Sequence, residues 1–399
     1  MQHDLIIIGA GPAGLSFALS LRDSGLKVAI VERLTRDELA DPPEDGRDIA
    51  LTHLSRRLMQ QHGSWQRIGD EHISPIHRAE VVDGDSPYAL HFDKPTDESD
   101  GLGFLVANYR IRKAIFEEFE TLGENFTLLD ATEVEQVHSD DHAAQVRLDN
   151  GKTLEAQLLV AADTRFSQSR RQMGIAADSV DFGRSAIVCE MEHELDHGHT
   201  AFECFHYGRT LAILPMPGLV SSIVVTAPAD QVDDIVGLSP EAFAQDIEQR
   251  LRHRLGSMKL LGKRHVYPLV AVHARRFQAR RFALVGDAAV GMHPVTAHGF
   301  NLGLSGQDLL AQGLLQAVRS GGDIAAPSLL QRYQRRHMLS TRPLYHGTNA
   351  IVGLFTDDDF PVTLARKAVL RLSNHLPPVK WAIRQQLMAK QHLSSLLPI

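Results

Sequence analysis

The first 32 residues constrain the fold most, because they place a strand, a glycine-rich turn, a helix and a second strand in continuous order. Residues 4–8 are apolar, residues 9–14 read GAGPAG, and residues 15–24 carry helical spacing before a strand-like run at 27–31. Glycines at this spacing allow a tight turn and a close backbone approach to a pyrophosphate at a helix N-terminus. Glu32 ends the second strand, where an acid accepts adenosine ribose hydroxyls. The segment predicts a Rossmann-like dinucleotide-binding unit.

A second segment, residues 280–303, indicates which dinucleotide is bound. An apolar strand at 282–285 runs into Gly286 and Asp287, and residues 299–303 form a turn that reads GFNLG. An aspartate at the carboxyl end of a strand can accept a ribityl hydroxyl, and such a turn presents backbone N–H groups to an electron-rich ring edge. A flavin has both groups and NAD has neither, so we expect FAD as the cofactor.

Composition narrows the class of protein and its location. The chain has 399 residues, is 43% hydrophobic and carries a net charge of −8, which argues against a nucleic-acid partner. Its two cysteines, Cys189 and Cys204, form no CxxC pair, and no HExxH motif occurs, so we expect no metal site. We find neither a signal peptide nor a spanning apolar run, which predicts a cytoplasmic protein, peripheral on the inner membrane at most.

The middle of the chain has a different pattern from its ends. Residues 185–192, 201–206, 210–214 and 221–226 alternate in strand fashion, which predicts a mainly antiparallel sheet inserted into a Rossmann-like α/β domain. Helical patterns dominate after Gly303. The expected division is a discontinuous FAD-binding domain at 1–71, 105–180 and 276–345, a substrate domain at 72–104 and 181–275, and a C-terminal helical region at 346–399.

The C-terminal tail, residues 361–399, carries a charge of its own. It holds six Lys and Arg residues and no Asp or Glu, so the rest of the chain has a charge of −14. Apolar residues recur there at helical spacing. Two readings stay open: contact with a membrane surface or an assembly partner, and two ordinary helices packed on the flavin domain.

These motifs together resemble the aromatic-ring flavoprotein monooxygenases of the para-hydroxybenzoate hydroxylase fold, and within them the ubiquinone-biosynthesis hydroxylases. The similarity covers essentially the whole chain, including the stretch GRTLAILP at 208–215. The resemblance implies FAD-binding roles for Gly9, Gly11, Pro12, Ala13, Gly14, Glu32, Arg33, Arg47, Asn108, Asp163, Asp287, Pro294, Gly299, Phe300 and Asn301. Asp163 and Asn108 also suit helix N-caps. Thr164 and His298 depart from the family pattern, which has glycine and glutamine there.

The implied activity is an FAD-dependent hydroxylation of a polyprenylated phenol or quinol in ubiquinone biosynthesis, with NAD(P)H as transient electron donor and O₂ as oxygen source. The alternative is the same chemistry on a small soluble aromatic compound. A flavin-holding assembly protein and a NAD-dependent dehydrogenase are further readings from other classes. Candidates for a general base are His206, Tyr207 and His293, by chain position alone.

Overall fold

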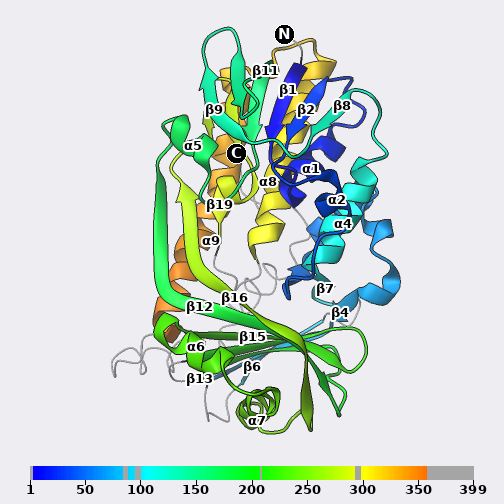
Figure 1. Cartoon of the computed structure of the whole chain (residues 1–399), viewed down its shortest axis with the longest axis vertical. Coiled ribbons are helices and arrows are strands. Elements are labelled where there is room, and N and C mark those ends of the chain that lie inside the picture. The colour runs from blue at the N-terminus through cyan, green and yellow to red at the C-terminus, as the bar shows by residue number, and fades with distance from the viewer. Residues whose placement is uncertain (1–2, 84–88, 95–99, 207–208, 293–297, 357–399) are drawn as a thin grey trace.

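The computed structural model describes residues 3–83, 89–94, 100–206, 209–292 and 298–356. Two large sheets organise these residues (Figure 1). One lies with its helices in the upper part of the view, and the other lies below it, with its strands crossing the base of the molecule. No helix in the described part of the chain is long and apolar enough to cross a membrane.

The first sheet is the Rossmann-like unit that the sequence predicts. Its path runs β17-β18-β11-β1-β2-β8, with the hairpin β9-β10 attached to β11. Four of its pairings, β18 to β11, β11 to β1, β1 to β2 and β2 to β8, are parallel. The strands are β1 His3–Ile8, β2 Val28–Val31, β8 Phe126–Leu129, β9 Val134–Ser139, β10 Ala144–Leu148, β11 Thr153–Ala161, β17 Gln278–Ala279 and β18 Phe282–Leu284.

Helices from three distant parts of the sequence pack beside this sheet and beside one another. Helix α1 contacts both α4 and α8, and α8 contacts α9. The α-helices are α1 Pro12–Ser20, α2 Arg36–Ala40, α3 His53–Gln61, α4 Asn108–Phe119, α5 Gln168–Gln172, α6 Val232–Val236, α7 Pro240–Arg250, α8 His298–Arg319 and α9 Pro327–Thr356.

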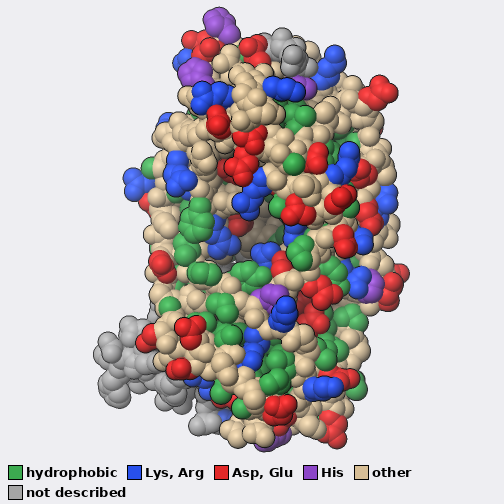
Figure 2. All heavy atoms as spheres, viewed as in Figure 1, with side chains coloured by type: hydrophobic (Ala, Val, Ile, Leu, Met, Phe, Trp, Pro, Cys, Tyr) green, Lys and Arg blue, Asp and Glu red, His purple; other side chains and the backbone are tan. Residues whose placement is uncertain are grey.

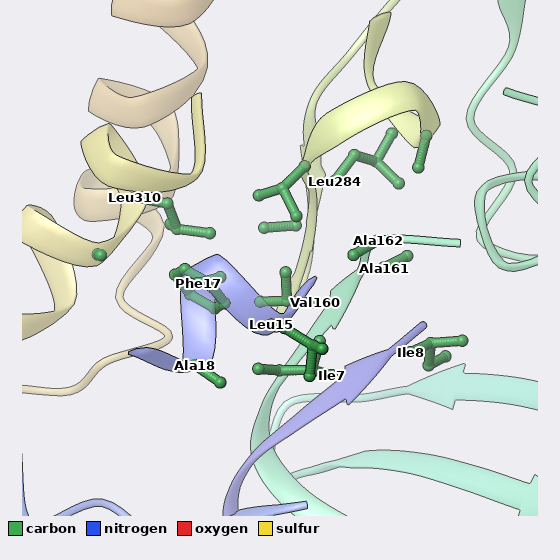
Figure 3. Close-up of a cluster of buried hydrophobic side chains, with 14 of the residues drawn as sticks. Ile7, Ile8, Leu15, Phe17, Ala18, Val160, Ala161, Ala162, Leu284 and Leu310 are labelled. Carbon is green, nitrogen blue, oxygen red and sulfur yellow. The ribbon is translucent and has the colours of Figure 1, made fainter. Parts of the chain in front are cut away.

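The main core lies between the parallel strands and α1 and α8. Ile7, Phe17, Val160, Leu284 and Leu310 all have no exposed surface and come from five different elements (Figure 3). A continuous apolar run is what a strand buried on both faces requires. Burying side chains of this size stabilises the fold by roughly 1.5–3 kcal/mol each. This core therefore holds the three segments of the FAD-binding part together.

The second sheet carries the long strands of the middle of the chain. Its order is β19-β16-β12-β15-β14-β13-β5-β6, and every pairing is antiparallel except β13 to β5. The strands are β5 Arg78–Asp83, β6 Ala89–Asp93, β12 Ala177–His193, β13 Thr200–His206, β14 Arg209–Pro215, β15 Val220–Pro228, β16 Met258–Ala274 and β19 Val290–Gly291. Helix α7 packs on one face of this sheet through Phe243, which is fully buried. The predicted inserted, mainly antiparallel sheet is confirmed.

A small third sheet, β3-β7-β4, lies between the two large ones (Figure 1). Its antiparallel strands are β3 Asp48–Leu51, β4 Ser74–Ile76 and β7 Gly103–Ala107. Its side chains join a cluster with side chains from β5, β13 and β14 of the lower sheet. The chain crosses between the two main parts near residues 72–104, and β12 begins before the boundary at 181 of the predicted division, which stays a prediction. The predicted C-terminal helical region is described only as far as the end of α9.

Candidate active site

The glycine turn between β1 and α1 is shaped by two close backbone approaches and one open position. A Cβ on Gly9, whose φ is +101°, would lie 2.6 Å from the Ala162 carbonyl oxygen, and one on Gly14 would lie 2.0 Å from the Gly9 oxygen. A Cβ on Gly11 would meet nothing within 4 Å. Gly11 is also the N-cap of α1, with Pro12 following it. The open space at Gly11 therefore lies at a helix N-terminus, where a pyrophosphate binds favourably.

Glu32 lies at the end of β2 and faces the same turn. Its carboxylate accepts hydrogen bonds from the Ala10 N–H at 2.6 Å and from the Leu34 N–H at 2.9 Å. A cavity of about 60 Å³ is bordered by Gly11, Glu32 and Arg112 together with apolar side chains of α1 and α4. This is the place expected for the adenosine half of FAD. Arg33, next to Glu32, is exposed.

Arg112 was missed by sequence reasoning, although it lies four residues after Asn108 on one face of α4. It borders the same small cavity as Glu32. Burial lowers the pKa of its guanidinium, and the carboxylates of Asp45 and Glu32 oppose that effect. The group stays charged, because the ordinary pKa of arginine is far above neutrality. It can therefore offer a cation to a phosphate.

Asp163 follows β11 and has one carboxylate oxygen engaged and one free. Oδ2 accepts hydrogen bonds from the Ser167 hydroxyl at 2.9 Å and the Ser169 N–H at 3.4 Å. Oδ1 is buried and has no hydrogen-bond partner among the described residues. The N-cap of α5 is Ser167 and not Asp163. A buried acceptor of this kind is costly without a partner, so it fits a ligand hydroxyl.

Asp287 lies in the turn after β18, close to the glycine turn of β1. A Cβ on Gly286 would come within 2.6 Å of the Ala13 Cβ, which shows how tightly the two turns pack. Asp287 Oδ2 lies 3.4 Å from Arg165 Nη2, and its side chain is 42% exposed. Desolvation by the surrounding protein raises the pKa of Asp287, while the charges of Arg165 and Arg47 lower it. Arg165 is a second site residue that sequence reasoning missed.

Arg47 and Asn108 lie together in a separate cluster centred on Asp45. Arg47 Nε donates to Asp45 Oδ2 at 2.9 Å, and Asn108 Nδ2 donates to the same oxygen at 2.8 Å. The Arg47 guanidinium lies 5.1 Å from the ring centre of Tyr267, whose hydroxyl donates to the Asp45 carbonyl. The N-cap of α4 is Ala107 and makes no side-chain cap, so Asn108 does not serve as a cap.

The glycine-rich turn at 299–303 forms the start of α8. Asn301 Oδ1 accepts from the Thr52 N–H at 3.0 Å and from the Ser55 hydroxyl at 2.7 Å, and its amide nitrogen donates to Ala50. These bonds tie α8 to β3 and α3. Gly299 and Phe300 are partly buried. Because these three bonds engage the Asn301 amide, Asn301 itself would contact a flavin through its backbone.

Four sequence candidates lie beyond what the structure describes in full. Tyr207, His293 and Pro294 are outside the described residues, and of His206 only the backbone at the end of β13 is described. Of the other candidates, the glycine turn at 9–14, Glu32, Asp163 and Asp287 lie at the carboxyl ends of the parallel strands, which is where open α/β sheets bind ligands. Figure 2 shows a hollow at mid-height, between the upper and lower parts of the molecule.

A polar cavity of about 220 Å³ lies between the small sheet and the lower sheet. Asp48, Tyr109, Arg110 and Glu190 are among its lining residues. Neither carboxylate oxygen of Asp48 has a hydrogen-bond partner among the described residues. Burial raises the pKa of Asp48 to about 7. Asp48 was missed by sequence reasoning, although it directly follows Arg47.

Comparison with known proteins decides the family. The model of an FAD-binding domain family matches residues 2–343. The chain belongs to this family of FAD-binding proteins. FAD is therefore its cofactor, as the two glycine-rich segments predict.

Two similar proteins are named as ubiquinone hydroxylases. The chain is 50% identical over 391 residues to ubiquinone hydroxylase UbiM of Neisseria meningitidis. This match covers 97% of this chain and 85% of the relative. It is 36% identical over 378 residues to ubiquinone hydroxylase UbiL of Rhodospirillum rubrum. This match covers 94% of this chain and 87% of the relative. The predicted membership of the ubiquinone-hydroxylase branch is confirmed.

Solved structures agree on the fold. The p-nitrophenol 4-monooxygenase PnpA of Pseudomonas putida superposes with a TM-score of 0.77 at 17% identity, over 98% of each chain. The predicted fold and the predicted class of enzyme, an FAD-dependent monooxygenase, are both confirmed by the family and these similarities.

Proposed function

We propose that this chain hydroxylates the aromatic ring of a polyprenylated phenol or quinol on the route to ubiquinone. NAD(P)H supplies the electrons and O₂ supplies the oxygen atom. The observation that carries the proposal is the 50% identity to a ubiquinone hydroxylase across 97% of the chain. The described site residues are compatible with a flavin at the junction of the two sheets.

The residues that would hold FAD fall into groups, and each group suits a different part of the cofactor. Gly11 and the N-terminus of α1 suit the pyrophosphate, and Glu32 suits the adenosine ribose. The free Oδ1 of Asp163 and the partly exposed carboxyl of Asp287 suit hydroxyl groups of the ribityl chain or ribose. When bound, the flavin supplies electron transfer and oxygen activation. The protein then orients the substrate ring and excludes water from it.

Genetic deletion followed by mass spectrometry tests the proposal. Cells that lack this gene should accumulate a quinone precursor that is lighter than the next intermediate by one oxygen atom. Purified enzyme with NAD(P)H and that precursor should restore the missing oxygen, and ¹⁸O₂ should label it. Unchanged ubiquinone in the deletion strain, together with hydroxylation of a small soluble phenol, would select the alternative substrate class.

The basic tail, residues 361–399, lies outside the described residues, and we propose that it contacts an anionic membrane surface. Each Lys or Arg near such a surface contributes about 1 kcal/mol, and salt weakens the attraction. In liposome flotation, binding should need anionic lipid and should fall when Lys380, Arg384 and Lys390 become Gln. Replacing three Lys or Arg residues of the described surface is the charge-matched control. Equal flotation of the tail variant would favour the packed-helix reading.

A further inference from the structure

Four histidine rings lie in a row where the chain passes from the small sheet to the lower sheet. The ring centres of His193 and His197 are 5.4 Å apart, and His199 continues the row at 5.5 Å from His197. His77, between β4 and β5, completes it at 4.7 Å from His199. No group of His, Cys, Asp and Glu within the described part of the chain could hold a metal ion. Rings this close influence one another's protonation, because one charged imidazole repels a second.

His197 has a hydrogen-bond partner at each ring nitrogen, and the two partners fix its neutral form. Its Nε2 lies 2.9 Å from the Met216 carbonyl oxygen and therefore donates to it. Its Nδ1 accepts from the backbone N–H of His199 at 3.1 Å. The His197 side chain is only 2% exposed. A neutral imidazole has one donor and one acceptor nitrogen, so these two bonds use both of them.

A proton added at Nδ1 of His197 breaks the bond to His199, because a backbone N–H cannot become an acceptor. Asp196 offers a replacement partner, since its Oδ1 lies 3.5 Å from the same nitrogen. That oxygen also accepts from the Gly198 N–H at 2.8 Å. The loop 196–199 therefore has two alternative sets of hydrogen bonds, one for each protonation state of His197.

His193 differs from His197, because its hydrogen bonds survive protonation. Its Nδ1 donates to the Leu195 carbonyl at 2.9 Å, and its Nε2 accepts from the Ser221 hydroxyl at 3.0 Å. A hydroxyl can rotate and accept instead of donating. Burial lowers the pKa of His193, and positive charge on His197 lowers it further. His197 is thus the ring of this pair whose charging changes the bonding of the loop.

Titratable and charged groups surround the row on several segments. Those on the adjoining segments are Glu71, His72, Arg78, Asp93, Lys94, Glu194 and Asp196. Burial lowers the pKa of His77, and the charges of Lys94 and His199 lower it further. The pKa of Asp196 is lowered by its bond from the Gly198 N–H and by the charges of the histidines beside it. Asp196 therefore attracts a proton to His197, and the neighbouring positive charges oppose a second one.

His199 is held in a conformation that a histidine adopts at some cost. Its φ is +53°, directly after Gly198 at +56°. Its ring Nδ1 is buried and has no hydrogen-bond partner among the residues that the structure describes. Its carbonyl accepts from the His77 N–H at 2.9 Å, at the start of β5. The bond from the His199 N–H to His197 helps to hold this conformation, so its loss lets the loop relax.

The same two histidines hold the turn between β14 and β15, residues 216–219. The Met216 carbonyl accepts from the His197 ring, and the Leu219 carbonyl accepts from the His193 N–H at 2.9 Å. Met216 and Pro217 of this turn line the polar cavity of about 220 Å³. A change in the bonding of His197 therefore reaches one wall of that cavity.

We propose that the loop 196–199 is a proton-sensitive latch on the polar cavity. At neutral pH the uncharged ring of His197 links His199 to Met216 and keeps the turn 216–219 in place. In acid the ring takes up a proton from solvent and donates it to Asp196, the loop relaxes, and the turn loosens. The wall of the cavity then moves more freely. Histidine titrates near pH 6.5, so the change belongs to mildly acidic conditions. The inference does not depend on which substrate the enzyme hydroxylates.

Hydrogen exchange of the full chain with bound FAD tests the latch at pH 7.5 and pH 5.5, after correction for intrinsic exchange rates. Protection of segments 197–200 and 216–221 should fall about fivefold in acid, as expected for the loss of one hydrogen bond. In His197→Gln the side-chain amide still donates to Met216 but does not titrate, so protection should be equal at both pH values. The control His253→Gln removes a 65% exposed imidazole after α7 and should follow the unaltered protein.

Several outcomes would overturn the inference. One is an equal fall in protection in His197→Gln and the unaltered protein, and another is unchanged protection in both. A fall of the same size in β1 and β11 would assign the effect to acid unfolding of the whole chain and would also overturn it. If His197→Gln fails to fold, Asp196→Asn provides the test. This variant lacks the charge that attracts the proton, so the fall must move to lower pH, and an unmoved fall would contradict the latch.

Discussion

Gly11 and Gly14 have opposite structural roles, although they belong to one motif. Gly14 is required by the fold itself, because a side chain there meets the Gly9 carbonyl oxygen at 2.0 Å. Gly11 has ordinary extended backbone angles and empty space beside it. The fold itself therefore accepts a side chain at Gly11, and only a bound ligand would exclude one.

We expect Gly11→Ala to fold normally and to bind FAD at least tenfold more weakly, because its methyl group enters the space of the pyrophosphate. Gly14→Ala should instead lower the thermal midpoint even without FAD, since overpacking costs typically 1–3 kcal/mol. Calorimetry of the apoproteins and flavin titration measure the two effects separately. A folded Gly11→Ala that binds FAD at full strength would contradict the pyrophosphate assignment.

Asp287 gives a second prediction at the scale of one residue. Its carboxyl is partly exposed and paired only loosely with Arg165, so Asp287→Ala should leave the core intact. A hydrogen bond to a charged group contributes roughly 1.5–3 kcal/mol, which equals a ten- to hundredfold loss of FAD affinity. Fluorescence titration with FAD measures this, with Asp178→Ala on the distant Arg275 pair as control. Unchanged affinity would remove Asp287 from the flavin site.

At the scale of elements, His273 joins β16 to α9. Its ring is buried, with Nδ1 2.9 Å from the Ala274 oxygen and Nε2 3.1 Å from the Thr341 hydroxyl. Burial lowers the pKa of His273 to about 4. The unfolded chain, with a histidine pKa near 6.5, binds the proton first as pH falls, so stability decreases from pH 6.5 down to pH 4.

This site alone should cost on the order of 3 kcal/mol between those two pH values. His273→Phe keeps an aromatic ring beside Phe277 and Tyr345, and it should lose less stability than the unaltered chain between pH 7.5 and pH 5. Urea unfolding at both pH values measures the difference. His62 is also buried, and burial lowers its pKa to about 4, so a variant of His62 provides the comparison. Equal acid sensitivity of all the variants would show that other groups dominate.

How far the sequence predicts the elements depends on whether their signals are local. The turn at 9–14, the strand ends before Asp163 and Asp287, and most strands of the lower sheet follow from local patterns. Strand β16 does not follow from the local pattern, because Pro268 argues against a central strand there. In the structure Pro268 lies opposite Ser185, at a break in the β12 register. Arg112 and Arg165 escaped because only tertiary packing brings them to the site.

At the scale of the whole molecule, the FAD site is assembled from segments that are far apart in the chain. The turn at 9–14, Asp163 and Gly286 meet although they are separated by more than a hundred residues each. Bound FAD should therefore stabilise the complete FAD-binding part and not one loop. At a free FAD concentration of 100 times the Kd, we expect about 2.7 kcal/mol of added stability. Thermal unfolding with and without FAD checks this, and Gly11→Ala should show a clearly smaller shift at the same FAD concentration.

The two 17-residue strands β12 and β16 pair from Ala177 and Ala274 down to His193 and Met258, and they span the upper and lower parts of the molecule (Figure 1). Mechanically they form a strap of about 55 Å with two built-in bend points, the register breaks after Asp181 and Val188. Flexing there tilts the lower sheet without breaking its ladders. Over three strand spacings of this sheet, roughly 14 Å, a tilt of about 5° would move a side chain by about 1 Å, a displacement large enough to change a reaction rate a hundredfold. We expect the curvature of this strap to set the height of the gap in which a substrate ring must fit.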